Sequence, residues 1–497
     1  MKKQYLDWFP FERFLFPPSP TDWLPDDHLA YFILDLVFKL DLSRIERKYQ
    51  VKDARGQRPY HPAMMTALLL YAYCVGVPSS RRIERATYED VAFRVIAGGA
   101  HPDHTVISEF RRKNLTELGE LFLQVLELCQ KLGMVKLGYV SLDGTKVEAN
   151  ASKHKAMSYE RMLKKKDELA REVKALLAEA GAVDGEEDKR YGREAGLSGD
   201  IPEELRRRQT RLERISGAIE ALEAEAAAAR ARQLAERARE AEKRAEGEDS
   251  GVREEKRAER IRRQAEEAAR RAEEAACKAG ASRPDVSPRE REELPRHQVP
   301  TTAEGKPTAK AQRNFTDPDS RIMKRDGGYI QGYNGQIVVD SEFQLIVATG
   351  LTNQPADAGH YIPMIEKVEE NCGRLPEKVS ADAGYWSEEN WTWNEEREVD
   401  AYIATSRQKH GEELPPIRGR PPEGLTGKQK MQRKVRTKRG REVYGRRKAV
   451  VEPVFGQMRT TQRLKRFLLR GLKKASGEWD IYCLAHNILK MYRAQMA

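Results

Sequence analysis

Apolar positions in the N-terminal part of the chain recur at the spacing of helices. An apolar run begins at Pro62, a residue type favoured in the first turn of a helix, and continues to a break at Gly76. A second helix is expected after Ser79 and Ser80, both good capping residues. Residues 1–135 are therefore predicted to form an all-helical domain.

The middle of the chain has a different pattern, with long runs of Ala, Glu, Arg and Lys and few aromatic residues. Apolar residues recur here at heptad spacing, in two complementary sets: Leu205, Leu212, Ile219 and Ala226, with Ile215 and Leu222. This spacing predicts a coiled coil or a helical hairpin over residues 156–310, ending in a flexible, proline-containing exit. Such charge runs are usually solvated helix faces, and no chemistry is expected from this one.

Residues 311–497 return to a pattern of strands and helices. Two strands are expected in GYIQGYNGQIVVDSEFQLIVATGLTN, a helix from Asp357 to Val368, strands in KVSADAGYW and VDAYIATS, and helices in EPVFGQMR and WDIYCLAHNILKMYRAQ. A first strand is expected earlier, in YVSLDGTKVEAN within residues 136–155. This is the element order of a ribonuclease H-like mixed sheet interrupted after its first strand. The predicted fold class is α/β, with an all-α N-terminal domain and a helical insertion.

Two carboxylates stand on strands that would be neighbours in such a sheet. Asp143 lies in the first strand, and Asp382 lies where the strand in KVSADAGYW ends. Two buried carboxylates at close range repel unless they are protonated or bridged by a cation, and Mg²⁺ prefers oxygen ligands. A third carboxylate is expected from a late helix, and Glu452 is the candidate. Pro453 follows it, which predicts that Glu452 lies at or near a helix N-terminus or a bend.

Each of these acidic residues also has an ordinary structural interpretation. Asp143 with the glycine after it is a frequent hairpin turn, Asp382 could cap the next helix, and Glu452 could be a first-turn glutamate favoured by the helix dipole. All three coincidences would have to occur in the right order on the right elements, so the joint pattern favours a catalytic set. Asp357 is expected to be a helix cap and is left out of the site with His360.

The net charge of the chain indicates which class of molecule it binds. The chain has 497 residues with 89 Lys and Arg against 78 Asp and Glu, a net charge of +11, which favours a polyanionic partner. No stretch approaches the ~20 apolar residues needed to cross a bilayer, so no membrane association and a cytoplasmic location are predicted. The five cysteines are scattered without a CxxC pair, so neither a disulfide framework nor a zinc site is indicated.

Two basic features are candidates for DNA contact. Arg81, Arg82 and Arg85 are expected on the outward face of the second helix, either facing phosphates or as the solvated face of a helical bundle. Residues 426–448 are strongly basic and lie directly before Glu452. They could be a disordered loop or a phosphate-binding track, and their position favours the track.

Taken together, SLDGTKVEAN, ADAGYW and VEPVFGQMR resemble the three acidic motifs of bacterial insertion-sequence DDE transposases. The resemblance is to the group with an N-terminal helical transposase domain and a long helical insertion after the first catalytic strand. It extends to RPYHPAMMTALLLYAYCVG, SSRRIERA, PDHTVISEFRRKN, NFTDPDSRIMK and GYNGQIVVD, and so covers nearly the whole chain outside the insertion.

The resemblance implies a catalytic and metal-binding triad of Asp143, Asp382 and Glu452. These residues would hold two Mg²⁺ (or Mn²⁺) ions, one activating the attacking water or 3′-hydroxyl and one stabilising the leaving oxygen. The family also has a Tyr-x2-Arg-x3-Glu-x6-Lys signature that contacts the transposon end. Four residues here stand at or near the positions of this signature: Tyr444, Arg447, Lys448 and Arg459. Tyr444 and Arg447 keep their mutual spacing but lie one residue too far from Glu452, so that Lys448 takes the expected arginine position. Arg459 replaces the final lysine.

The function implied is that of a DNA transposase. It would bind the terminal inverted repeats of an insertion sequence and catalyse metal-dependent phosphodiester cleavage and strand transfer. Its partners would be double-stranded DNA, at the transposon ends and the target, and a second copy of the chain in a homodimer on DNA, in the bacterial cytoplasm and at the nucleoid when bound. The alternatives are a non-catalytic DNA-binding relative of the same fold and a coiled-coil structural protein.

Overall fold

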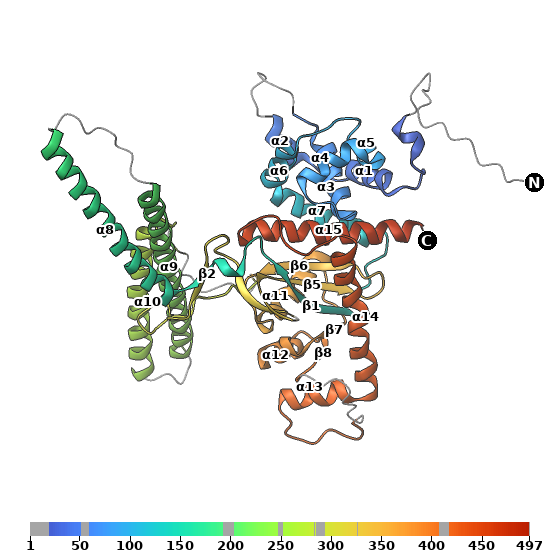
Figure 1. The fold of residues 1–497 in the computed structure, drawn as a ribbon. Helices are drawn as coiled ribbons and strands as arrows, with labels where there is room; N and C mark the ends of the chain where they lie inside the picture. Colours follow the sequence, from blue (N-terminus) through green and yellow to red (C-terminus); the bar gives the residue numbers. More distant parts are fainter. Residues whose placement is uncertain are drawn as a thin grey trace, which may run out of the picture.

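The structure, a computed structural model, describes residues 19–50, 59–191, 203–246, 252–282, 284, 294–325, 327–406 and 417–496. Figure 1 shows N-terminal helices above a central sheet, and a long helical insertion to one side of that sheet. None of the described helices is long and apolar enough to span a membrane.

The N-terminal part is helical, as predicted. Its elements are η1 (Pro20–Trp23), α1 (Leu29–Lys39), α2 (Ser43–Gln50), α3 (Pro62–Cys74), α4 (Ser80–Glu89), α5 (Val91–Ile96), α6 (His104–Lys113) and α7 (Leu115–Lys131). The predicted helix start at Pro62 and the break before Ser79 are confirmed. Ser79 occupies the N-cap position of α4, although its hydroxyl makes no capping hydrogen bond.

The central sheet has six strands of mixed direction: β1 (Val140–Glu148), β4 (Arg321–Arg325), β5 (Gly328–Asp340), β6 (Ile346–Thr352), β7 (Lys378–Ala381) and β8 (Asp400–Ile403). The main order is β4-β5-β1-β7-β8, with β6 also paired to β5. β1 runs antiparallel to β5 and parallel to β7, so the first strand in sequence is central in space. This is the predicted ribonuclease H-like α/β class.

Helices cover both faces of the sheet. They are η3 (Ala358–His360), α11 (Tyr361–Cys372), η4 (Ala383–Tyr385), α12 (Glu388–Glu396), α13 (Gly427–Arg436), α14 (Lys438–Thr460) and α15 (Leu472–Met496). Contacts at two glycines show which helix packs on each face of the sheet. A Cβ at Gly335 would lie 2.7 Å from the Trp479 ring of α15, and one at Gly350 would lie 3.3 Å from the Met364 sulfur of α11. α14 packs against β1, β7 and β8.

α15 also joins the sheet to the N-terminal helices. It packs against β6 on one side and against α3 and α7 on the other, as Figure 1 shows. The rings of Tyr73 in α3 and Tyr482 in α15 meet edge to face at 4.8 Å, and both side chains are buried. The two parts therefore share one apolar core.

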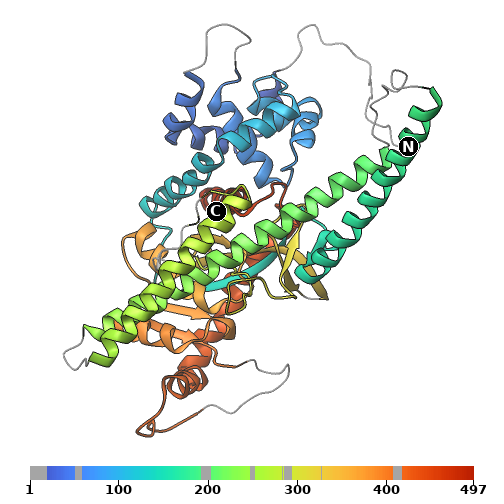
Figure 2. The ribbon, with the colours of Figure 1, turned by 90° about the vertical axis from the view of Figure 1, so that its left-hand side faces the viewer.

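The insertion is a bundle of α8 (Tyr159–Tyr191), α9 (Glu203–Ala245) and α10 (Val252–Lys278), whose long helices Figure 2 shows from the side. Of the heptad residues, Leu205, Ile215, Ile219, Leu222 and Ala226 are buried. The helices fold back on one another, with α9 packed against both α8 and α10. The heptad pattern therefore describes an intramolecular bundle.

Short elements close the base of the insertion. η2 (Lys153–Lys155) leads into β2 (Ala156–Ser158), which pairs antiparallel with β3 (Gln312–Asn314) where the chain returns to the sheet. The predicted flexible exit is wrong for residues 294–310. Val299 is buried in the insertion core, and the backbone N–H of His297 donates to Asn353 at 2.8 Å. The part of that exit at 283 and 285–293 lies outside the described residues.

Candidate active site

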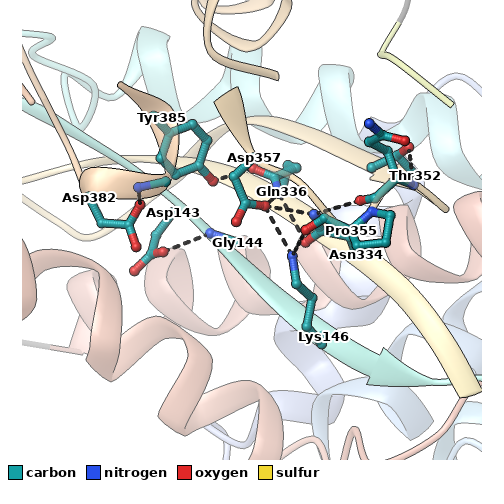
Figure 3. A network of polar contacts seen from close by, with 12 residues as sticks. Asp143, Gly144, Lys146, Asn334, Gln336, Thr352, Pro355, Asp357, Asp382 and Tyr385 are labelled. Atoms are coloured by element: carbon teal, nitrogen blue, oxygen red, sulfur yellow. Dashed lines mark hydrogen bonds and ion pairs between the residues drawn. The ribbon is translucent and has the colours of Figure 1, made fainter. Parts of the chain in front are cut away.

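Asp143 and Asp382 lie side by side on adjacent strands. Leu142 of β1 pairs with Ala381, the last residue of β7, so Asp143 and Asp382 are the residues that directly follow this pair. Figure 3 shows the carboxyl groups next to each other. The hairpin-turn interpretation of Asp143 is wrong, because Asp143 and Gly144 lie inside β1, opposite Ile337 and Gln336 of β5.

The Asp143 carboxylate is held by two donors. Its Oδ1 accepts from the Gly144 N–H at 2.8 Å, and its Oδ2 accepts from the Arg447 guanidinium of α14 at 2.8 Å. Burial raises the pKa of Asp143 to about 6, and the nearby charge of Asp382 raises it further, while Arg447 and the Gly144 N–H oppose the rise. Burial therefore outweighs the stabilisation that Arg447 and the Gly144 N–H give to the charged carboxylate.

Asp382 is fixed by the backbone that follows it. Its Oδ1 accepts from the Gly384 N–H at 2.8 Å, which makes it the N-cap of the one-turn helix η4. It does not cap α12, because Ser387 does so through its own hydroxyl, which accepts from the Asn390 N–H at 3.0 Å. The turn holds the Asp382 carboxylate at the end of β7, beside Asp143.

Glu452 lies in the interior of α14, so of its two predicted places, a helix N-terminus and a bend, the N-terminus is wrong. α14 begins at Lys438 and continues past Pro453. Proline has no N–H for the carbonyl oxygen four residues earlier. Here the Gln344 side-chain amide donates to that oxygen, on Ala449, at 3.0 Å. A partner from a distant loop thus supplies the missing hydrogen bond, and the helix continues.

The Glu452 side chain is exposed, between two arginines that α14 sends to β1. Arg447 contacts Asp143, and the Arg459 guanidinium donates to the Thr145 hydroxyl at 2.6 Å. At 1.5 Å per residue, Glu452 is about 7.5 Å along the helix from Arg447 and ~10 Å from Arg459. α14 packs against β1, and along the helix Glu452 lies between these two contacts with its side chain exposed.

The three carboxylates do not form a preformed metal cage. Across the described part of the chain, the only three His, Cys, Asp or Glu side chains with ligand atoms all within 4.8 Å of one another are Glu84, Asp103 and His104. These lie in the N-terminal helices, away from Asp143. An ion bound by all three carboxylates would therefore require their oxygen atoms to move closer together.

The other predicted DNA contacts have different surroundings. Tyr444 is half-buried with the Arg447 guanidinium 5.9 Å from its ring centre, whereas Lys448 is exposed. Residues 426–448, for which a disordered loop was one prediction, form α13 and the first half of α14. In α4, Ile83 is buried and all three arginines are exposed, as predicted: Arg81, Arg82 and Arg85. Arg85 is paired with Glu89 at 2.8 Å.

Asp357 belongs to a polar network beside the aspartate pair, and its predicted role as a helix cap is wrong. Its side chain makes no capping hydrogen bond. Instead its Oδ1 accepts from Lys146 at 3.1 Å, Asn334 at 2.7 Å and Gln336 at 3.1 Å, as Figure 3 shows. A polar pair two residues apart in an apolar strand, Asn334 and Gln336, was the signal for this network, since such residues share one sheet face.

Tyr385 connects this network to the aspartates. Its hydroxyl donates to the Gln336 side-chain oxygen. Burial raises its pKa well above the usual range, and the charges of Asp357, Asp143 and Asp382 add to the rise. Tyr385 therefore stays neutral and faces three carboxylates.

The packing of this network requires a glycine at position 144. A Cβ there would lie 2.5 Å from the Gln336 side-chain nitrogen and 3.1 Å from the Asn334 oxygen. The Gln336 amide thus occupies the space that a side chain at 144 would need. The glycine after Asp143 lets the network cross β1 on the face opposite α14.

Comparison with known families gives two matches. Residues 18–113 match the Transposase domain (DUF772), and residues 422–492 match the Transposase DDE domain. The second match includes Arg447, Glu452 and Arg459 and excludes Asp143 and Asp382. Among curated proteins and among solved structures, nothing matches the chain.

Proposed function

The chain belongs to the insertion-sequence DDE transposases, and we propose that it binds the terminal inverted repeats of its element, cuts the DNA there and joins the ends to target DNA. The observation that carries this proposal is the adjacency of Asp143 and Asp382 on β1 and β7, under a helix that bears Glu452. Two neighbouring carboxylates, one inside β1 and one directly after β7, are a site for a hard divalent cation.

The donor set fits Mg²⁺ or Mn²⁺. Asp143 and Asp382 offer neighbouring carboxylate oxygens, and burial together with the nearby charge of Asp382 raises the pKa of Asp143, an effect that a bound cation would oppose. When bound, two such ions would activate the attacking oxygen and stabilise the leaving oxygen of the phosphodiester. Asp143, Asp382 and Glu452 would hold the ions.

The chain's own residues position this chemistry. Arg447 holds Asp143 in place, and the η4 turn holds Asp382. We assign DNA contacts to Tyr444, Lys448 and Arg459 on α14, and Arg447 is available for DNA when it leaves Asp143. Residues 1–135 are proposed as a DNA-binding domain that meets phosphates through three exposed arginines: Arg81, Arg82 and Arg85.

Transposition joins two ends, so we propose a homodimer on DNA, in the cytoplasm and at the nucleoid when bound. A non-catalytic DNA-binding relative of the same fold is the second candidate. The exposed position of Glu452 and the Arg447 contact to Asp143 favour that alternative.

Nicking of a labelled duplex with the element's terminal repeat, in Mg²⁺ or Mn²⁺, tests the proposal. Wild type should cut, and Asp143→Asn, Asp382→Asn and Glu452→Gln should each bind the repeat without cutting it. Glu442→Gln is the matched control, because Glu442 is an exposed carboxylate on the same helix, and it should cut normally. A wild-type protein that binds the repeat but never cuts it would establish the non-catalytic alternative.

A further inference from the structure

A basic cleft lies where the insertion meets the rest of the chain. It has a volume of about 1310 Å³, and among the described residues that line it there is no Asp or Glu. Six arginines line it: Arg206, Arg207, Arg211 and Arg214 from α9, Arg313 from β3, and Arg470 from the segment before α15. Cationic side chains gathered without acidic ones are suited to a polyanion.

Several of these charges have no internal partner. Arg207 pairs with Glu203, and Arg313 pairs with Glu225. Within the described residues, Arg206, Arg211 and Arg214 form no ion pair, and all three are exposed. Elsewhere in the insertion, arginines such as Arg263 and Arg271 are paired with a glutamate one turn earlier. The cleft is therefore a place where the insertion's charges are left unpaired.

Further cations connect the cleft to the candidate active site along the line of β1. Arg447 contacts Asp143, Arg459 contacts Thr145, and Arg466 lies 3.5 Å from the Glu148 carboxylate. Arg470, which lines the cleft, donates to the Asn150 carbonyl oxygen at 3.0 Å. Arginines thus follow the strand from the aspartate at its middle to the cleft beyond its end.

The length of this line matches a short piece of duplex DNA. From Asp143 to Glu148, where β1 ends, the strand advances five residues, about 17 Å at ~3.3 Å per residue, and Asn150 lies two residues further along the chain. Duplex DNA rises ~3.4 Å per base pair, so the strand part of this line spans about five base pairs. The cleft then lies about one half-turn or more of duplex away from the cut.

We propose that the cleft at the base of the insertion binds the phosphate backbone of duplex DNA that leads away from the scissile phosphate at Asp143 and Asp382. The insertion thereby acts as a second DNA-binding surface, and not only as a spacer. This inference rests on the proposed function, because it takes its direction from the cut site.

The test compares two charge-matched triple variants of the full chain. Arg206→Ala/Arg211→Ala/Arg214→Ala removes the unpaired cleft arginines. Arg253→Ala/Arg257→Ala/Arg260→Ala removes three exposed arginines of α10 that do not line the cleft. Both lose three positive charges from exposed helix positions, where alanine favours the helix. Circular dichroism and thermal unfolding check that both fold.

The binding constant is measured as a function of salt concentration for three duplexes. The short one ends about five base pairs from the cut on both sides. The other two extend about 20 base pairs beyond the cut, one on the repeat side and one on the flanking side. The cleft variant should bind one of the extended duplexes at least tenfold more weakly than wild type. Its slope of log K against log salt should fall by about two to three, since each phosphate contact contributes ~0.9. The short duplex should bind wild type and both variants alike. The side on which extension matters identifies the DNA that occupies the cleft.

Equal losses for the cleft and control variants, or no loss for either, would overturn the cleft proposal. These outcomes are separate from the proposed function, which the nicking assay decides. If the wild-type protein never cuts DNA but the cleft variant binds the long duplex more weakly, the cleft proposal is supported and the catalytic proposal is rejected. If the wild-type protein cuts DNA and the cleft variant binds the long duplex as wild type does, the catalytic proposal is supported and the cleft proposal is rejected.

Discussion

The Arg447 guanidinium donates a 2.8 Å hydrogen bond to the Asp143 carboxylate, so a helix cation compensates the charge of the central strand's aspartate. Both side chains are mostly buried, at 11% and 20% exposed. Arg447→Ala should lower the free energy of unfolding by roughly 1–3 kcal/mol without divalent ions, since it leaves a buried carboxylate without its charged partner. Thermal unfolding with and without Mg²⁺ measures this.

Mg²⁺ should stabilise the Arg447→Ala variant more than it stabilises wild type, because the ion no longer competes with the guanidinium for Asp143. Asp143→Asn/Arg447→Ala serves as the control and should show the smallest Mg²⁺ effect. An equal Mg²⁺ shift in wild type and Arg447→Ala would contradict the idea that the arginine and the metal share this carboxylate.

The contribution of the Gln344–Ala449 hydrogen bond to the free energy of unfolding should depend on Pro453. Gln344→Glu keeps an acceptor for Lys490, which donates to the Gln344 side-chain oxygen at 2.6 Å, but removes the donor to Ala449. We expect a loss of about 0.5–1.5 kcal/mol in the wild-type background. In a Pro453→Ala background the restored N–H can serve Ala449, so the loss should be smaller. A double-mutant cycle by urea unfolding measures the coupling, and a coupling of zero would count against this account of the helix.

Gly144→Ala should disrupt the network that surrounds Asp357. The added methyl group would lie 2.5 Å from the Gln336 amide and would displace it from Asp357 and Tyr385. We expect a destabilisation of roughly 1–3 kcal/mol and a loss of DNA cleavage with binding retained. Gly445→Ala is the control, because beyond the adjacent backbone of α14 no described atom lies within 4 Å of a Cβ at that position. Equal cleavage by the two variants would show that the network does not position the site.

Asp357→Asn tests the same network without a steric change. Lys146 would lose its carboxylate partner in a site where both side chains are mostly buried. Cleavage should fall at least tenfold while repeat binding stays within about twofold, because Asp357 acts through Gln336 and Tyr385. Restoration of cleavage in Lys146→Met/Asp357→Asn would identify the unpaired lysine as the cause. A single Asp357→Asn variant that cuts like wild type would remove Asp357 from the positioning role.

His486 should make stability fall in acid. It is buried, with its Nε2 2.9 Å from the Gln344 carbonyl oxygen, and burial lowers its pKa to about 3. An unfolded histidine has a pKa of about 6.5, so the unfolded state binds the proton first as the pH drops. This residue's contribution is complete above about pH 6.5 and is lost progressively toward pH 3.

Between pH 7 and pH 5 the loss attributable to His486 is about 2 kcal/mol, at ~1.4 kcal/mol per pH unit below 6.5. Thermal midpoints of wild type and His486→Gln at the two pH values measure it. The variant should show the smaller acid-induced decrease, and parallel decreases would mean that His486 does not titrate in this way.

Patterns local to a strand or helix were enough to predict much of the fold. Alternating apolar residues predict strands around Asp143 and before Asp382, and the element order makes those strands neighbours, as the structure shows. The helix start at Pro62 followed from local backbone preferences. In each case the deciding interaction lies within one element or follows from the order of elements.

The wrong predictions share a different cause, which is a partner far away in sequence. Pro453 indicates a helix boundary by local rules, yet Gln344 supplies the hydrogen bond that lets α14 continue. Asp357 has the position of a cap, yet Lys146 and the polar residues of β5 hold its carboxylate. These donors become visible only once the sheet has formed.

The central place of β1 has a consequence for synthesis on the ribosome. β1 is complete at Glu148, but its partner β5 ends at Asp340 and β7 ends at Ala381. At ~5–20 residues per second, about 10–40 seconds pass before β5 has been made. During that interval the apolar strand with Asp143 has neither neighbour, while the insertion's helices, which contact nearby sequence, can already fold. Nascent chains stalled in this window should therefore need chaperone protection that the finished protein does not.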